Sequence, residues 1–181
     1  MTPSPETSLV SMEHNEAIDS LELAFGASDL FRAVELPLIH RFTEGQYIRE
    51  IFMPAKTWVV SKIHKTQHPY FVLSGRVSVW INGEWQTIQA PYSGTTEAGT
   101  RRVLYIHEDC IWATVHATNI KPSGDSDWEI QEAVDRIEEK IIEPHDNFKL
   151  TPEMKEKLLY NINGRLNKID SPLISDKNVM G

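Results

Sequence analysis

Residues 69–88 read PYFVLSGRVSVWINGEWQTI, and this stretch decides the fold class. Its runs rich in valine, isoleucine and aromatic residues, at 69–73, 76–81 and 84–88, are typical of β-strands. Ser74-Gly75 marks a tight bend between the first two runs, and Asn82-Gly83 between the second and third is a strong signal for a two-residue hairpin. The stretch therefore predicts three consecutive antiparallel strands.

The same pattern extends in both directions along the chain. We expect further strands at 46–52, 57–63, 101–106 and 111–117, a second hairpin at Glu108-Asp109, and a longer loop marked by Pro91, Gly94 and Gly99. At least six short strands within about eighty residues are typical of a sandwich or barrel. The predicted fold is therefore mainly β: a small antiparallel β-barrel over residues 40–120, with N-terminal and C-terminal helices.

Helical spacing is confined to the two ends of the chain. Residues 1–12 predict a disordered tail, and residues 13–39 an N-terminal helical segment. Residues 125–168 predict two amphipathic helices, the first with a capping box formed by Ser126 and Glu129, and residues 169–181 predict a loose tail. Helices this short are unstable alone, so we expect them to pack on the barrel or on a second subunit.

The net charge of −8 is distributed unevenly: residues 1–30 carry −6, residues 31–124 carry +3 and residues 125–181 carry −5. An acidic chain is a poor candidate for gripping nucleic acid through phosphates, whereas a mildly basic middle is compatible with a small anionic ligand. The sequence has no apolar run long enough for a membrane span, and its N-terminus lacks the features of a secretion signal. The single cysteine, Cys110, fits a reducing compartment, so we expect a cytoplasmic protein without a membrane or nucleic-acid partner.

Four of the seven histidines lie between residues 46 and 117, where the strands are expected: His64, His68, His107 and His116. Lys62 and His64 are two residues apart on one predicted strand and leave it on the same face, and the chain then turns before His68. These side chains can converge on one point if the strand faces a cavity. Imidazole is the commonest protein ligand for transition metals, so His64 and His68 are the first candidates for a site.

The stretch HKTQHPYFVLSGRVSV, residues 64–79, resembles the first conserved motif of the cupin superfamily. That motif reads His-x-His, three or four residues, Glu, six residues, Gly. Counting back from Gly75 places the glutamate of the motif at His68, its second histidine at His64 and its first at Lys62.

The second cupin motif reads Pro-x-Gly, two residues, His, three residues, Asn, and residues 97–106 are similar to it. The glycine is kept as Gly99, but Arg102 stands at the place of the metal-binding histidine. The resemblance covers residues 45–118 and implies a barrel of the cupin or jelly-roll type with a degenerate metal motif. It extends to short cupin-like proteins carried by bacterial viruses, which would place the chain in the host cytoplasm.

The two changed positions alter the expected chemistry. Lys62 and Arg102 stay protonated, so they are poor metal ligands and repel a divalent cation, but they attract a carboxylate or a phosphate. The residues expected to bind such a ligand are Lys62, His64, His68, Tyr70, Arg102 and Tyr105. If the strand at 111–117 turns His116 inward, then His64, His68 and His116 form a three-histidine site for a divalent Zn, Fe, Mn or Ni ion.

Three functions stay open on this basis. The first is a cupin-like binding protein that holds a small anionic ligand in the barrel mouth. The second, implied by the resemblance, is a metal-dependent cupin enzyme of the isomerase or dioxygenase type; no catalytic residue is assigned, and whether the chain is an enzyme is left undecided. The third is a structural or interaction module, such as a viral accessory protein, with a vestigial pocket. Exposed strand edges need cover, so we expect a homodimer.

Overall fold

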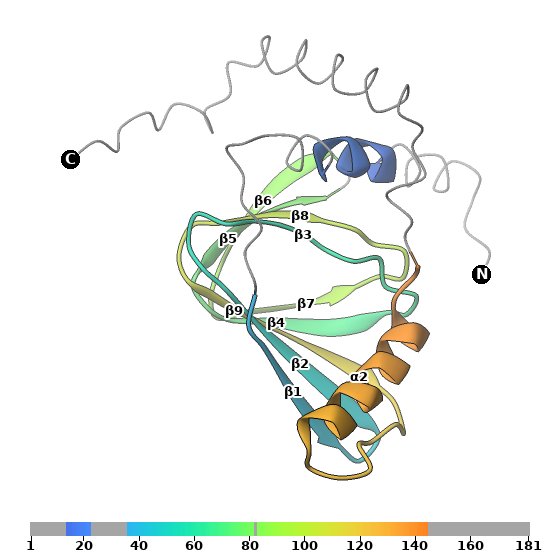
Figure 1. The fold of residues 1–181 in the computed structure, drawn as a ribbon. Helices are drawn as coiled ribbons and strands as arrows, with labels where there is room; N and C mark the ends of the chain where they lie inside the picture. The colour runs from blue at the N-terminus through green and yellow to red at the C-terminus, as the bar shows by residue number, and fades with distance from the viewer. Residues whose placement is uncertain (1–13, 23–35, 82, 145–181) are drawn as a thin grey trace. The chain divides into compact units, whose positions relative to one another are not determined.

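The computed structural model describes residues 14–22, 36–81 and 83–144 (Figure 1). Strands dominate this part of the chain: β1 (Leu38–Thr43), β2 (Gln46–Met53), β3 (Trp58–Val60), β4 (His68–Ser74), β5 (Arg76–Ile81), β6 (Glu84–Gln89), β7 (Tyr92–Thr96), β8 (Val103–Ile106) and β9 (Cys110–Ala117). Helix α2 spans Asp127–Ile141, and residues 14–22 are also helical. The prediction of a mainly β fold flanked by helices is confirmed.

The strands form two antiparallel sheets that face each other (Figure 1). The five-stranded sheet has the order β1-β2-β9-β4-β7, and the four-stranded sheet has the order β3-β8-β5-β6. Without β1, which is an extra strand at one edge, this is the interleaved eight-strand order of a double-sheet jelly roll. The chain passes between the sheets at the connections β2–β3, β3–β4, β4–β5, β6–β7, β7–β8 and β8–β9. The predicted jelly-roll type of fold is therefore confirmed.

The two turns that decided the prediction are found where the sequence places them. Ile81 pairs with Glu84 across the 82–83 turn, where Gly83 has a φ of +84°. Gly75, between β4 and β5, also has a φ of +84°, and a Cβ at this position would overlap the carbonyl oxygen of Asp109. Only glycine satisfies both the left-handed backbone and the close approach at Gly75.

Two strands lie where the sequence predicted other structure. β1 begins at Leu38, within the segment assigned to N-terminal helices, and it pairs with β2 along its whole length. β7 occupies part of the segment that was predicted as a long loop. That prediction was wrong because Pro91 and Gly94, which are typical of loops, outweighed the strand signal of the tyrosine and threonines between and after them. Gly94 has a packing reason, since a Cβ there would overlap the ring of Tyr70 on the neighbouring strand.

The core between the sheets is apolar, with Val72, Val77, Ile106 and Cys110 among its buried residues. Helix α2 makes a second cluster, in which its buried stripe packs against the extended end of β2 at Tyr47 (Figure 1, orange). That stripe consists of Ala133, Val134, Ile137 and Ile141. The predicted capping box is present at Ser126 and Glu129. The helix therefore extends the core past the end of the jelly roll.

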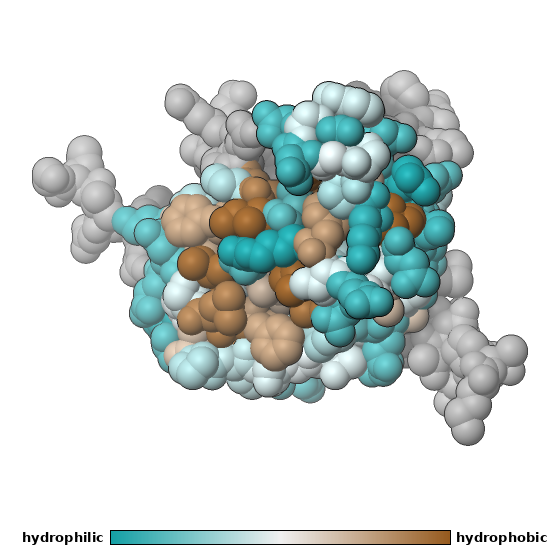
Figure 2. Space-filling model, turned by 90° about the horizontal axis from the view of Figure 1, so that it is seen from below, coloured by the Kyte–Doolittle hydropathy of each residue, from teal (hydrophilic) through white to brown (hydrophobic). Residues whose placement is uncertain are grey.

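The outer face of the five-stranded sheet carries exposed apolar side chains. Ile39, Phe52, Phe71 and Leu73 are each 38–52% exposed. Figure 2 views the molecule from this side and shows a broad apolar area crossed by hydrophilic side chains. The expected homodimer stays a prediction.

Residues 14–18 belong to the same compact unit as the sheets, whereas residues 19–22 belong to a second unit. Within the first unit, His14 contacts the backbone oxygen of Arg101 through Nε2 at 2.8 Å, and Ile18 is fully buried. The helices of the described residues are too short to span a bilayer. The tail predicted at 1–12, the second C-terminal helix and the tail at 169–181 lie outside the described residues.

Candidate functional site

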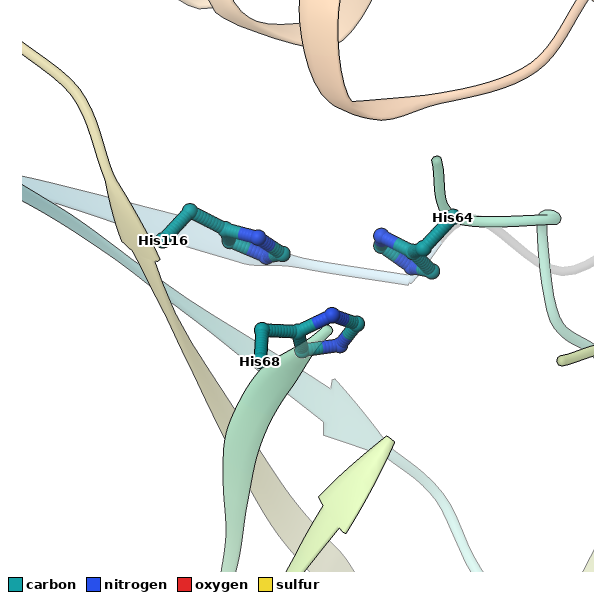
Figure 3. A group of neighbouring side chains, drawn as sticks. All are labelled: His64, His68 and His116. Atoms are coloured by element: carbon teal, nitrogen blue, oxygen red, sulfur yellow. The ribbon is translucent and has the colours of Figure 1, made fainter. Parts of the chain in front are cut away.

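Three histidines from separate parts of the chain meet inside the jelly roll. His68 lies on β4, His116 lies on β9, and His64 lies in the connection between β3 and β4. Figure 3 shows the three rings turned toward one another. Their centroids are 4.3 Å apart for His64 and His68, 4.3 Å for His68 and His116, and 5.3 Å for His64 and His116. All three residues are buried, with at most 9% of each exposed.

Strand alternation explains why His68 and His116 point inward. On β4 the buried residues are His68, Tyr70 and Val72, and on β9 the inward set includes Trp112 and His116. The sequence left open which side of the 111–117 strand faces inward. In the structure, the side that carries His116 faces inward.

His64 is positioned by the segment that follows α2. The backbone N–H of Lys65 donates to the carbonyl oxygen of Ile141 at 2.8 Å, and that of Glu143 donates to Ile63 at 2.9 Å. These bonds form a short antiparallel bridge between His64 and Ile142. The end of α2 thus holds the third histidine against the other two.

The hydrogen bonds leave lone pairs available in the cluster. Nδ1–H of His68 donates to the carbonyl oxygen of Thr66 at 3.0 Å, so its Nε2 carries the free lone pair. The Nδ1 atoms of His64 and His116 are buried and have no hydrogen-bond partner among the described residues. A buried imidazole nitrogen without a partner costs free energy, which is a reason to expect a ligand there.

Burial keeps the imidazoles neutral. It is the main cause that lowers the pKa of His64 to about 3 and that of His116 to about 3, and the charges of neighbouring His68 and Arg49 lower both further. Burial also lowers the pKa of His68, with Arg102 adding to the effect. Neutral imidazole is the form that coordinates metals, so the cluster is ready to bind one near neutral pH.

The donor set fits a transition metal. The candidate ligand atoms of the three histidines all lie within 4.8 Å of one another. Nitrogens bound to one zinc ion at 2.0–2.1 Å are about 3–4 Å apart, so small side-chain rotations would bring the atoms into range. Three histidines with no protein carboxylate leave coordination positions open for another ligand.

Arg102 lies beside the histidines as a half-buried cation. Its Nη1 donates to the hydroxyl of Thr96 at 2.9 Å, and its guanidinium carbon is 5.2 Å from the centroid of the Tyr70 ring. Burial lowers its pKa, but an arginine keeps its proton at any physiological pH. Within the described part of the chain, Arg102 has no carboxylate partner.

Lys62 and Arg49 share one carboxylate at the rim of the site. Nζ of Lys62 is 2.9 Å from Oε2 of Glu138 on α2, and Nη2 of Arg49 is 3.9 Å from Oε1 of the same residue. The Lys62 side chain is 53% exposed, so its charge is directed toward α2 and solvent. Sequence reasoning missed Arg49, although its alternation with Tyr47 and Ile51 on β2 places it on the inward face.

A cavity of about 350 Å³ opens onto these groups. Its polar lining consists of Arg49, Ser61, Lys62, His64, His68, Thr96, Arg102 and Thr114, and its larger apolar residues are Leu36, Leu38, Ile51, Met53, Leu104 and Trp112. His116 meets the lining through its ring contact with His68. This volume is at the small end of the range of ligand pockets, about 300–1,000 Å³.

The two tyrosines expected at the site are placed differently from each other. Tyr70 is buried, stacks on Trp112 with centroids 4.5 Å apart, and supports Arg102 from behind the cavity lining. Tyr105 packs on Trp58 and His107, away from the residues that line the cavity. Burial raises the pKa of Cys110 to about 11, so its thiol stays protonated near neutral pH and is a poor nucleophile.

Comparison with known proteins finds likeness at the level of structure. No family model matches the chain, and no curated protein matches it by sequence. The chain is similar to a cupin-2 domain protein from Shewanella frigidimarina at 14% identity and a TM-score of 0.38, covering 49% of this chain and 86% of that one. It is similar to a cupin superfamily protein from Desulfitobacterium hafniense at 8% identity and a TM-score of 0.41, covering 48% and 80%. The cupin domain of Schizosaccharomyces pombe Cnp3 matches at 18% identity and a TM-score of 0.40, covering 48% and 65%.

Proposed function

We propose that this protein binds a small anion in the cavity, against Arg102 and beside a divalent metal ion held by His64, His68 and His116. The observation that carries the proposal is the placement of a half-buried guanidinium without a carboxylate partner, among the described residues, next to three neutral histidines. A charge partly removed from water loses hydration free energy, and an opposite charge beside it compensates for that loss. A bound anion would offset this cost.

The metal and the anion would depend on each other. A divalent ion at the three histidines is repelled by Arg102 and Arg49, and an anion bound between them reduces that repulsion. Since coupling free energies are reciprocal, each ligand should raise the affinity for the other by the same factor. A metal bound there would keep open coordination positions and polarise an oxygen of the anion.

The metal half is tested by titration of untagged, chelator-treated protein with Zn²⁺, Mn²⁺, Fe²⁺ and Ni²⁺, followed by elemental analysis. We expect one equivalent of at least one metal in the wild type, loss of that metal in His116→Gln, and retention in His107→Gln. His107 is a suitable control because it hydrogen-bonds Ser78 on the other sheet. A wild type that retains no metal would contradict this half of the proposal.

The anion half is tested by calorimetric titration with acetate, with and without the metal. Arg102→Met should abolish acetate binding, whereas Arg136→Met, on the exposed face of α2, should not change it. Equal acetate affinity with and without bound metal would refute the predicted coupling. Acetate binding that survives in Arg102→Met would refute the assigned anion site.

A further inference from the structure

The cavity lining changes from polar to apolar along the five-stranded sheet. The register of β2 and β9 places the inward residues in successive cross-strand pairs, and each pair is one level of the cavity. Arg49 is opposite Thr114, Ile51 is opposite Trp112, and Met53 is opposite Cys110. The histidine cluster lies beyond the Arg49 end of this series, because His116 is opposite Tyr47. The inward residues therefore run from imidazole and guanidinium to purely apolar side chains.

The facing sheet repeats the same order. The connection after β3 pairs Ser61 with Arg102, through the Ser61 N–H and the Arg102 carbonyl oxygen at 2.9 Å. The next inward pair in this direction is Val59 and Leu104, which both line the cavity. Leu38 on β1 is opposite Ile51 and adds to the apolar level. Two sheets thus place their polar residues at one end of the cavity and their apolar residues at the other.

The charges of the described lining residues are all at the polar end and all positive. They are Arg49, Lys62 and Arg102, and the first two share Glu138. One carboxylate against three cations leaves a net positive charge at this end, and Arg102 is the cation without a carboxylate partner among the described residues, so the acidic group of a ligand belongs against Arg102. The His116 and Trp112 levels are four residues apart on β9, or about 13 Å at about 3.3 Å per residue.

We infer that the ligand of this cavity is an apolar monocarboxylate, such as a short- to medium-chain fatty acid or an arylalkanoic acid. This inference rests on the proposed anion site and adds the hydrocarbon part of the ligand, which the anion site alone does not define. The carboxylate meets Arg102 in a bidentate contact at the histidine end. The hydrocarbon body extends along Ile51, Val59, Leu104 and Trp112, where a second charged group would be desolvated without a partner.

The test is a titration series of acetate, butanoate, hexanoate and octanoate into the full-length wild type. Each buried methylene should tighten binding about fourfold until the apolar end is filled. Hexanedioate matches hexanoate in length but carries a second carboxylate, so it should bind far more weakly.

A matched pair of variants locates the apolar end. Val59→Phe narrows it and should weaken octanoate binding by about tenfold or more while leaving acetate affinity unchanged. Val115→Phe makes the same substitution on β9 one residue from His116, on the outward-facing alternation, and should leave both affinities unchanged. If Val59→Phe fails to fold, the chain-length series on the wild type still decides the question.

Two kinds of failure can be told apart. Acid binding that requires Arg102 but does not depend on chain length, or hexanedioate binding as tightly as hexanoate, would overturn this inference and leave the anion site intact. Absence of any Arg102-dependent acid binding would overturn both proposals.

Discussion

Acid should destabilise the metal-free protein through its buried histidines, and the size of the effect can be worked out. His64 and His116 have folded-state pKa values of about 3, against about 6.5 in an unfolded chain. Between these values the unfolded chain binds protons that the folded chain does not, so stability is fully present above pH 6.5 and falls as the pH falls. From pH 7 to pH 5, each of these histidines should cost about 2 kcal/mol of unfolding free energy.

The assay is urea denaturation of chelator-treated protein at pH 7, 6 and 5, with the wild type compared with His116→Gln. Because glutamine does not titrate, the wild type should lose about 2 kcal/mol more than His116→Gln between pH 7 and pH 5. His107→Gln serves as the control. Burial lowers the pKa of His107, but this residue lies on the rim of the other sheet. The acid-induced loss of unfolding free energy should therefore differ less between the wild type and His107→Gln than between the wild type and His116→Gln.

Equal acid losses in the wild type and His116→Gln would refute the reasoning. That result would mean that His116 is protonated in the folded protein at pH 5, and hence that the cluster is more hydrated than the structure shows. Added metal should raise the free energy of unfolding at pH 7, and this gain should shrink on acidification because protons and metal compete for the same lone pairs.

Three further perturbations test the fold and the rim of the site. Gly75→Ala should lower the free energy of unfolding by more than about 3 kcal/mol, because it combines a φ of +84° with overlap against a backbone carbonyl. Gly83→Ala, with the same φ and open space around its Cβ, should lower it by about 1 kcal/mol. Similar losses of the two variants in urea denaturation would contradict this contrast. Ile137→Ala removes a fully buried side chain from α2 and should cost about 2–5 kcal/mol, so a loss below about 1 kcal/mol would show that α2 is not packed as described. Glu138→Gln releases Arg49 from its carboxylate and should tighten acetate binding measured by calorimetry, with weaker binding as the outcome that counts against the charge argument.

Much of the strand pattern was predictable from local sequence. Apolar alternation and the Asn82-Gly83 turn located the strands of the central hairpins, because both signals arise from side chains and backbone preferences of neighbouring residues. β7 carried no such signal, since its Gly94 is selected by the Tyr70 ring on the adjacent strand. A residue chosen by a tertiary contact cannot be recognised from its sequence neighbours.

The candidate site was predictable only in part. His64 and His68 are close in sequence, so their proximity followed from spacing, whereas the direction of His116 depends on how β9 pairs with β2 and β4. Arg102 and Tyr105 were both expected at the cavity. They are three residues apart, and side chains at that spacing on an extended chain point to opposite faces. That rule alone would have separated the two.

The bridge between His64 and Ile142 also makes the completed site depend on α2. His68 and His116 meet where β4 and β9 pair, whereas His64 is held by Gly99, whose N–H donates to its carbonyl oxygen at 2.8 Å, and by a partner 78 positions further along the chain. Docking of the end of α2 therefore completes the set of three imidazoles, so metal capture by all three would report that α2 is in place.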